Sequence, residues 1–147
     1  MSHSRMRLAA IGTLALLTGC ATYARSQGML APGIGVTDEL ISAGCESRAE
    51  YDELLAEAKT YRERAQFIPR SGWSACRVLA TIGAPHENTW IDVQGSRAMQ
   101  WTYWESAPAP SFGEAMMGAK SGGKVPRLVT IEPTEEHPRG EVTSVVW

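Results

Sequence analysis

Histidine and basic charge are both scarce in this chain of 147 residues. Three histidines are present, and 14 lysines and arginines stand against 16 acidic residues, for a formal net charge of −2. A nucleic-acid partner needs a basic face that displaces counterions, and this chain supplies none. No Ser/His/Asp or Cys/His set occurs at a recognisable spacing, and no glycine-rich phosphate loop opens a helix. We therefore expect a protein with no enzymatic activity, cofactor or bound metal.

The chain also lacks an apolar run of the roughly 20 residues that a membrane-spanning helix needs. Its apolar stretch Leu8–Leu17 is far shorter and follows Arg5 and Arg7, which is the pattern of a signal peptide. The stretch ends in Leu17-Thr18-Gly19-Cys20, which is similar to a bacterial lipobox. We expect residues 1–19 to be removed and Cys20 to carry acyl chains. The alternative is an ordinary signal peptide in which this cysteine occurs by chance.

Removal of 19 of the 147 residues leaves 128, with 12 basic and 16 acidic side chains and a net charge near −4. No polybasic patch is available to bind anionic lipid, so the lipid on Cys20 has to be the membrane anchor. Ala21 follows the cysteine, and the absence of aspartate there favours sorting to the periplasmic face of the outer membrane. Small, polar and glycine-rich residues then predict a flexible tether over 20–36 and a single domain over 37–147.

Acylation of Cys20 leaves Cys45 and Cys76 as the available pair in an oxidising periplasm. We expect a disulfide between them. It would close a 32-residue loop, which is worth about 3 to 4 kcal/mol in the chain-entropy model. The alternatives are two buried free thiols or a metal pair, although no histidine near either cysteine supports zinc.

The first half of the predicted domain reads as helices. Thr37 can cap a helix over 38–43, and Ser47-Arg48-Ala49-Glu50 has the pattern of a capping box. The helix that it opens is amphipathic and ends at Pro69. Its apolar residues recur in steps of three and four: Tyr51, Leu54, Leu55, Ala58, Tyr61, Ala65 and Ile68.

A third helix is predicted between Gly72 and Pro85. Ser74 can serve as its N-cap, and Gly83 can take a left-handed conformation that closes it before the proline. Four apolar residues fall on one face of this helix: Ala75, Val78, Leu79 and Ile82.

Alternating residues predict three strands, over 97–105, 127–132 and 141–147. Trp101 and Tyr103 share the inward face of the first strand, and Trp104 falls on the opposite face. The segment 106–126, with Met116-Met117 in its middle, reads as a long loop of the kind that is either functional or disordered. These elements predict an α+β two-layer sandwich, in which a helix pair packs across a three-stranded antiparallel sheet.

Five tryptophans are more than a small two-layer core is expected to hide. Trp73, just ahead of a helix, and Trp104, on the outer face of a strand, are the candidate partner-binding residues because exposed aromatics often anchor interfaces. The alternative is that the long loop and the terminal strand pack all five: Trp73, Trp90, Trp101, Trp104 and Trp147.

One set of residues carries a family resemblance: Gly72, Ser74, Gly83, Pro85, Trp101 and Tyr103. This Gly-x-Ser start, Gly-x-Pro end and later Trp-x-Tyr strand resembles the BamE (SmpA/OmlA) group of small outer-membrane lipoproteins, over about Ile68–Trp147. The resemblance implies a helix pair on a three-stranded antiparallel sheet, as in a proteinaceous β-lactamase inhibitor. It also implies an accessory part in the β-barrel assembly machinery. The chain departs from the family at Trp73, where methionine is common, and in the length of 106–126.

Together these features predict a non-enzymatic outer-membrane lipoprotein that binds another envelope protein and serves outer-membrane protein assembly or envelope integrity. Two alternatives stay open. One is an inhibitor or ligand-binding lipoprotein that acts on an envelope hydrolase through the sheet face around Trp104. The other is a structural envelope spacer without a stable partner.

Overall fold

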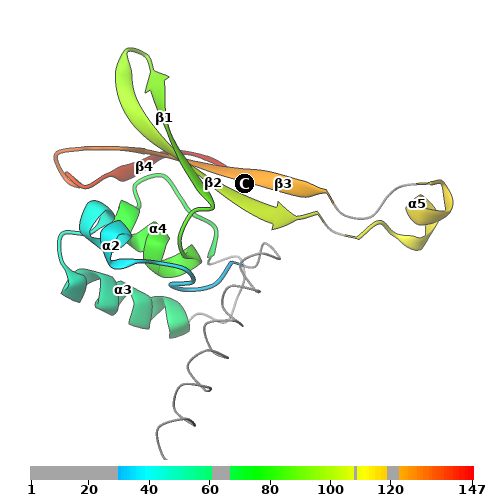
Figure 1. The fold of residues 1–147 in the computed structure, drawn as a ribbon, viewed down its shortest axis with the longest axis horizontal. Coiled ribbons are helices and arrows are strands. Elements are labelled where there is room, and N and C mark those ends of the chain that lie inside the picture. The colour runs from blue at the N-terminus through cyan, green and yellow to red at the C-terminus, as the bar shows by residue number, and fades with distance from the viewer. Residues whose placement is uncertain (1–29, 61–66, 108, 119–122) are drawn as a thin grey trace, which may run out of the picture.

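The computed structural model of the chain describes residues 30–60, 67–107, 109–118 and 123–147. Within these ranges the strands form one antiparallel sheet of four in the order β1-β2-β3-β4, and α2, α3 and α4 lie together on one side of it (Figure 1). The predicted α+β class with an antiparallel sheet is confirmed, but the described sheet has four strands rather than three. The elements are α2 (Asp38–Gly44), α3 (Arg48–Thr60), α4 (Ala75–Ile82), β1 (Glu87–Val93), β2 (Ser96–Ser106), α5 (Phe112–Met116), β3 (Lys124–Glu132) and β4 (Glu141–Val146).

The strand that was not predicted is β1. It pairs with β2 from Glu87↔Thr102 to Val93↔Ser96 through a two-residue turn, Gln94-Gly95. Both turn residues have positive φ, 54° and 84°, as the tight hairpins that match strand twist require. The first four residues of β1 are all exposed, and only Ile91-Asp92-Val93 alternates, which is shorter than the four to eight residues of a recognisable strand pattern. This is why its sequence gave no strand signal.

Helices α2 and α3 begin close to where their caps predicted. Thr37 Oγ1 accepts a hydrogen bond from the Leu40 amide at 3.4 Å, and Ser47 Oγ accepts one from the Glu50 amide at 3.1 Å. The predicted capping box is only half formed, however, because the Glu50 carboxylate accepts from the Glu46 amide, at 2.7 Å. Of the predicted apolar positions on this helix, 61 and 65 lie outside the described residues. Ile68 is not helical and is 38% exposed, so the prediction for that position is wrong.

Helix α4 has the predicted N-cap and ends at the predicted glycine, but Gly83, with φ 93° and ψ −168°, is not in the left-handed helical conformation that was expected. Ser74 Oγ accepts from the Arg77 amide at 3.1 Å, and the helix ends at Gly83, which has φ 93°. The predicted apolar face, Ala75, Val78, Leu79 and Ile82, is buried. Residues 30–36, assigned above to the tether, pack against this end of α4, where the Ala84 amide donates to the Ile34 carbonyl at 2.8 Å.

The core lies between α4 and the helix-facing side of the sheet. Tyr103, fully buried, donates its hydroxyl hydrogen to the Gly83 carbonyl at 3.1 Å. Trp147 closes over it, with the two ring centroids 6.1 Å apart. The inward placement predicted for the β2 aromatics is therefore observed, and the other buried strand residues in this layer are Trp101, Val129, Ile131 and Val142.

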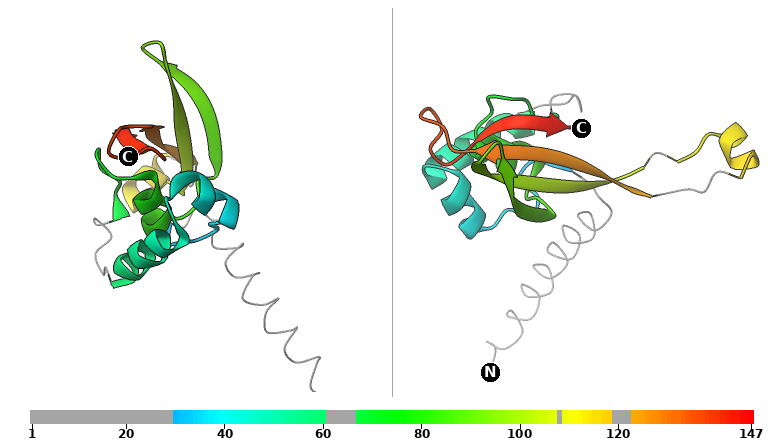
Figure 2. Two further views of the ribbon diagram at one scale, coloured as in Figure 1. Left: turned by 90° about the vertical axis from the view of Figure 1, so that its left-hand side faces the viewer. Right: turned by 90° about the horizontal axis from the view of Figure 1, so that it is seen from above.

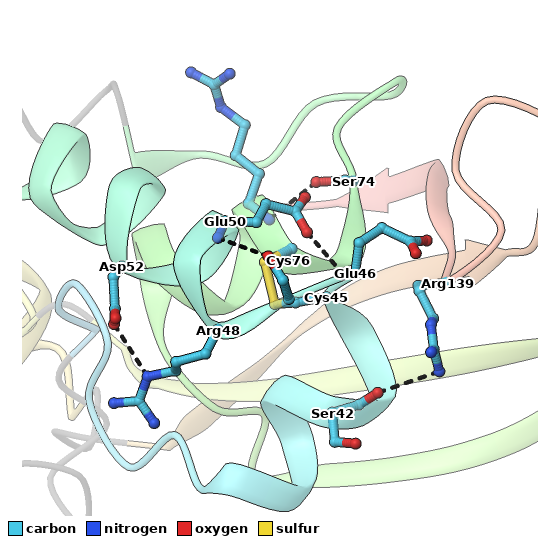
Figure 3. The surroundings of a disulfide bond; sticks show 11 residues. Ser42, Cys45, Glu46, Arg48, Glu50, Asp52, Ser74, Cys76 and Arg139 are labelled. Carbon is cyan, nitrogen blue, oxygen red and sulfur yellow. Dashed lines mark hydrogen bonds and ion pairs between the residues drawn. A yellow bond between two sulfur atoms is a disulfide. The ribbon is translucent and has the colours of Figure 1, made fainter.

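The predicted disulfide between Cys45 and Cys76 is confirmed, with the sulfur atoms 2.09 Å apart. Figure 3 shows it joining the end of α2 to the first turn of α4, beside Glu50 of α3. Both cysteines are buried. The bond therefore fixes α2 to the helix that fills the core.

Beyond the helices, β2 and β3 continue as a two-stranded arm. Their pairing runs from Met99↔Ile131 to Ser106↔Lys124, and Figures 1 and 2 show α5 at the far end of the arm. An ion pair between Arg127 and Glu105, 3.1 Å, bridges the two strands. The predicted loop over 106–126 is thus shorter at both ends and contains a helical turn.

We predict that the disulfide contributes much of the domain's stability. Replacing Cys45 and Cys76 together by alanine should lower the free energy of unfolding by about 3 to 4 kcal/mol, because the unfolded chain regains the entropy of a long loop. Urea unfolding followed by tryptophan fluorescence measures this. The wild type with reductant should approach the double variant, and a loss below about 1 kcal/mol would contradict the expectation.

Alanine substitutions at Gly72 and Gly83 distinguish the cost of backbone strain from the cost of a packing clash. An alanine Cβ at Gly83 would lie 2.5 Å from Ile34 Cγ2 and 2.6 Å from the Ile34 oxygen, whereas one at Gly72 would meet nothing within 4 Å. Both have positive φ, 93° and 90°. Gly72→Ala should cost about 1 to 2 kcal/mol for strain alone, and Gly83→Ala about 1 to 3 kcal/mol more. Equal losses in urea unfolding would show that the 30–36 segment does not pack there.

Candidate partner-binding surface

A surface pocket of about 300 Å³ lies between α3 and the start of α4. Glutamates of α3 form one wall of it, and the residues that lead into α4 form the other. His137, from the β3–β4 connection, closes one end. Its charged and aromatic lining side chains are Glu50, Glu53, Glu57, Trp73, Arg77 and His137.

The α3 wall is acidic because of helical spacing. Glu50, Glu53 and Glu57 stand at i, i+3 and i+7, which brings all three to the face that meets α4. Glu57 forms an ion pair with Arg77 at 3.1 Å, and these side chains are 46% and 35% exposed. Solvent screens a pair this exposed, so it adds little stability. The pocket keeps an excess of negative charge, which suits a basic group on a partner.

Trp73, predicted to bind a partner, lines this pocket. Its carbonyl accepts from the Val142 amide at 2.8 Å, and the Gly72 amide donates to the Val142 carbonyl at 2.9 Å. The guanidinium carbon of Arg77 lies 5.1 Å from the indole centroid, a cation–π contact. Trp73 is half-buried and packs against the core. The backbone bonds to β4 therefore fix the main chain at Trp73, and the contacts with Arg77 and the core orient its ring.

Trp104, the second predicted residue, lies elsewhere. Its neighbour Tyr103 points to the helices, so alternation along β2 turns Trp104 to the opposite face of the sheet. The indole N–H donates to Glu87 at 3.1 Å, and the backbone N–H donates to His86 Nδ1 at 3.2 Å. The structure does not bring Trp73 and Trp104 together. They cannot share one contact patch.

The aromatic and apolar groups that are most exposed were not singled out from sequence. Trp90 is 53% exposed, with the guanidinium carbon of Arg97 at 4.6 Å from its ring centroid. Phe112 and Met117 of the arm tip are 83% and 90% exposed. Two signals were available in the sequence: the Met116-Met117 pair, and Ser111 three residues before Glu114, which forms a complete capping box.

The six residues of the family pattern hold structural positions. Ser74 and Gly83 cap α4, Pro85 is buried directly after it, and Trp101 and Tyr103 lie in the core. Gly72 has φ 90° and open space around it. Cys20 lies outside the described residues.

Two groups of side chains in the described ranges have metal-ligand proximity. Cys45 and Cys76 with Glu50 form the first, but both sulfurs are in the disulfide. Glu136, His137 and Glu141 form the second, with ligand atoms within 4.8 Å of one another. Glu141 already accepts from the Thr134 hydroxyl at 2.9 Å, and acidic groups in a turn are ordinarily solvated. Neither group makes a case for a metal site.

No family model, curated protein or solved structure matches this chain. Among the helices of the described residues, none has both the length and the apolar character needed to cross a membrane.

The two candidate tryptophans should differ in their effect on stability. Trp73→Ala removes a ring that packs against the core, so it should cost about 2 to 3 kcal/mol, below the range for a fully buried tryptophan. Trp104→Ala removes a half-buried ring that lies outside the core cluster, together with its hydrogen bond to Glu87, and should cost about 1 kcal/mol. Urea unfolding of the single variants tests the order. A larger loss at Trp104 would contradict the assignment of the core side of the sheet.

Proposed function

We propose that this chain is an outer-membrane lipoprotein, anchored through Cys20 on the periplasmic face, whose domain binds another envelope protein. Its role would be accessory to outer-membrane protein assembly or envelope integrity. The observation that carries the proposal is the acidic pocket with Trp73 held in its wall by backbone hydrogen bonds to β4. The lipobox-like Leu17-Thr18-Gly19-Cys20 and the BamE-like pattern in Gly72–Pro85 support the location and the class of role.

The pocket has the chemistry of a protein interface. Tryptophan and arginine are enriched among the residues that dominate binding energy, and here Arg77 stacks on Trp73. A rigidly held anchor loses little entropy on association. The carboxylates of Glu50 and Glu53 add a negative rim, which favours a partner segment that carries lysine or arginine and disfavours acidic ones.

The test is co-purification of the tagged, full-length protein from gently solubilised envelopes. Because Trp73 also packs against the core, the diagnostic variant is Glu53→Lys, which reverses an exposed charge in the pocket. Its matched control is Glu39→Lys, an exposed glutamate of α2 outside the pocket. Wild type and Glu39→Lys should recover barrel-assembly subunits, and Glu53→Lys about tenfold less.

Two results would overturn this proposal. A wild-type preparation without any associated envelope protein would favour a spacer, and recovery of a hydrolase alone would favour an inhibitor. The mass of the peptide that contains Cys20 tests the anchor in the same preparation, since acyl chains add a defined mass.

A further inference from the structure

The arm ends in an apolar tip that none of the described residues covers. Phe112, Met116 and Met117 are 83%, 74% and 90% exposed, the largest exposures among large hydrophobic side chains of the described residues. Phe112 and Met116 stand at i and i+4 and so share one face of α5. Figure 2 shows α5 at the far end of the β2–β3 arm, away from the helices. Leaving this much apolar surface in water is costly unless the tip binds something.

The polar groups of the tip already have partners within the tip. The Glu114 carboxylate accepts from the Ser111 amide and hydroxyl, at 2.8 and 2.6 Å, and the Glu114 amide donates back to Ser111 Oγ. The amides of Ala115, Met117 and Gly118 donate to carbonyls of residues 111, 113 and 115. The groups that these bonds pair lose little on leaving water, which is what a lipid environment demands.

The same self-pairing argues against a protein groove as the occupant. A specific interface orients its partner with side-chain donors and acceptors around an apolar centre. Here Ser111 and Glu114 are bonded to each other, and the projecting side chains are a phenyl ring and two thioethers. These side chains offer apolar contact area but no directional hydrogen bonds, which suits the hydrocarbon region of a bilayer.

The distribution of charge along the sequence also favours a lipid environment for the tip. Segment 107–124 carries Glu114 against Lys120 and Lys124, a net charge of +1. The rest of the chain after Gly19 is therefore near −5, since the whole has 12 basic and 16 acidic residues. Hydrogen bonds from Ser111 hold the pKa of the Glu114 carboxyl below its usual value, so its charge stays at the capped end of α5. This segment is thus net positive in a chain that is acidic overall, so anionic phospholipid does not repel it.

We propose that the tip formed by Phe112, Met116 and Met117 inserts into the phospholipid bilayer on which the protein is anchored. The inference rests on the anchor at Cys20 proposed above. Nine residues, 21–29, separate Cys20 from the first described residue, Leu30, and the chain between the two can span at most about 35 Å. The domain therefore stays near the bilayer surface. A second attachment through the arm fixes which face of the domain points away from the membrane.

The experiment places a fluorophore on the tip of the full-length protein. Ala115→Cys puts an environment-sensitive dye on exposed α5, and Ser96→Cys puts it at the exposed start of β2, next to the β1–β2 turn, as a control. The proteins are reconstituted into vesicles of phosphatidylethanolamine and phosphatidylglycerol. Quenching by aqueous iodide and by brominated lipid is then measured. Aqueous iodide should quench the dye at position 115 about threefold less than the dye at position 96. Brominated lipid should quench the dye at 115 but not the dye at 96.

A second set of variants tests whether the native apolar side chains of the tip protect the dye from iodide. Ala115→Cys combined with Phe112→Ser, Met116→Gln and Met117→Gln should be quenched by iodide as strongly as the control. Ala115→Cys with Met116→Leu and Met117→Leu should stay protected. An exposed label at 115 in an intact, vesicle-bound protein overturns the proposal.

The outcomes separate this proposal from the one on which it rests. If the Cys20 peptide is acylated and the protein floats with vesicles while the label at 115 stays exposed, the tip proposal fails and the anchor stands. If no acyl mass is found and the protein does not float, the anchor fails, and with it the premise of the inference. Protection of 115 that requires an envelope extract, with cross-linking to a protein, overturns insertion in favour of a protein groove.

Discussion

The near-complete burial of α4 is the constraint on which the rest of the structure depends. Seven of its eight residues are buried. A helix with so little exposed surface needs partners on nearly every side, and each neighbouring element supplies one. The sheet covers one side, α3 packs along another, α2 is held by the disulfide at its first turn, and residues 30–36 close its last turn around Gly83. Removing any of these would expose apolar surface of α4.

Features of the fold that follow from neighbouring residues could be predicted from the sequence. The caps of α4 depend on Ser74 and Gly83, and the alternation of β2 depends on the order of Met99, Trp101 and Tyr103. Strand β1 could not be predicted, because its residues are mostly exposed and its existence depends on the tight turn and on the edge of β2. The Glu50 carboxylate likewise bonds to Glu46, an outcome that capping statistics do not determine.

The candidate partner-binding surface also combines features that local sequence predicts with features that only the packed fold determines. That Trp73 stands at a helix start and Trp104 on an outer strand face could be read from local pattern, and both positions are as expected. Their separation could not, because it depends on where α4 crosses the sheet. The carboxylates that accompany Trp73 come from α3, and His137 comes from the β3–β4 connection. Only the packed helices and sheet bring these side chains to one pocket.

The arm has a consequence for how this fold can diversify. The core residues of β2 and β3 lie in the pairs from Met99↔Ile131 to Trp101↔Val129. The pairs further out, as far as Ser106↔Lys124, add no side chain to the core apart from Tyr103. Arm length is therefore modular: two residues can be gained or lost on each strand without a change of register or of core composition. The length of the arm and the residues at its tip can then change in evolution, while selection for folding acts on α4 and the elements that pack around it.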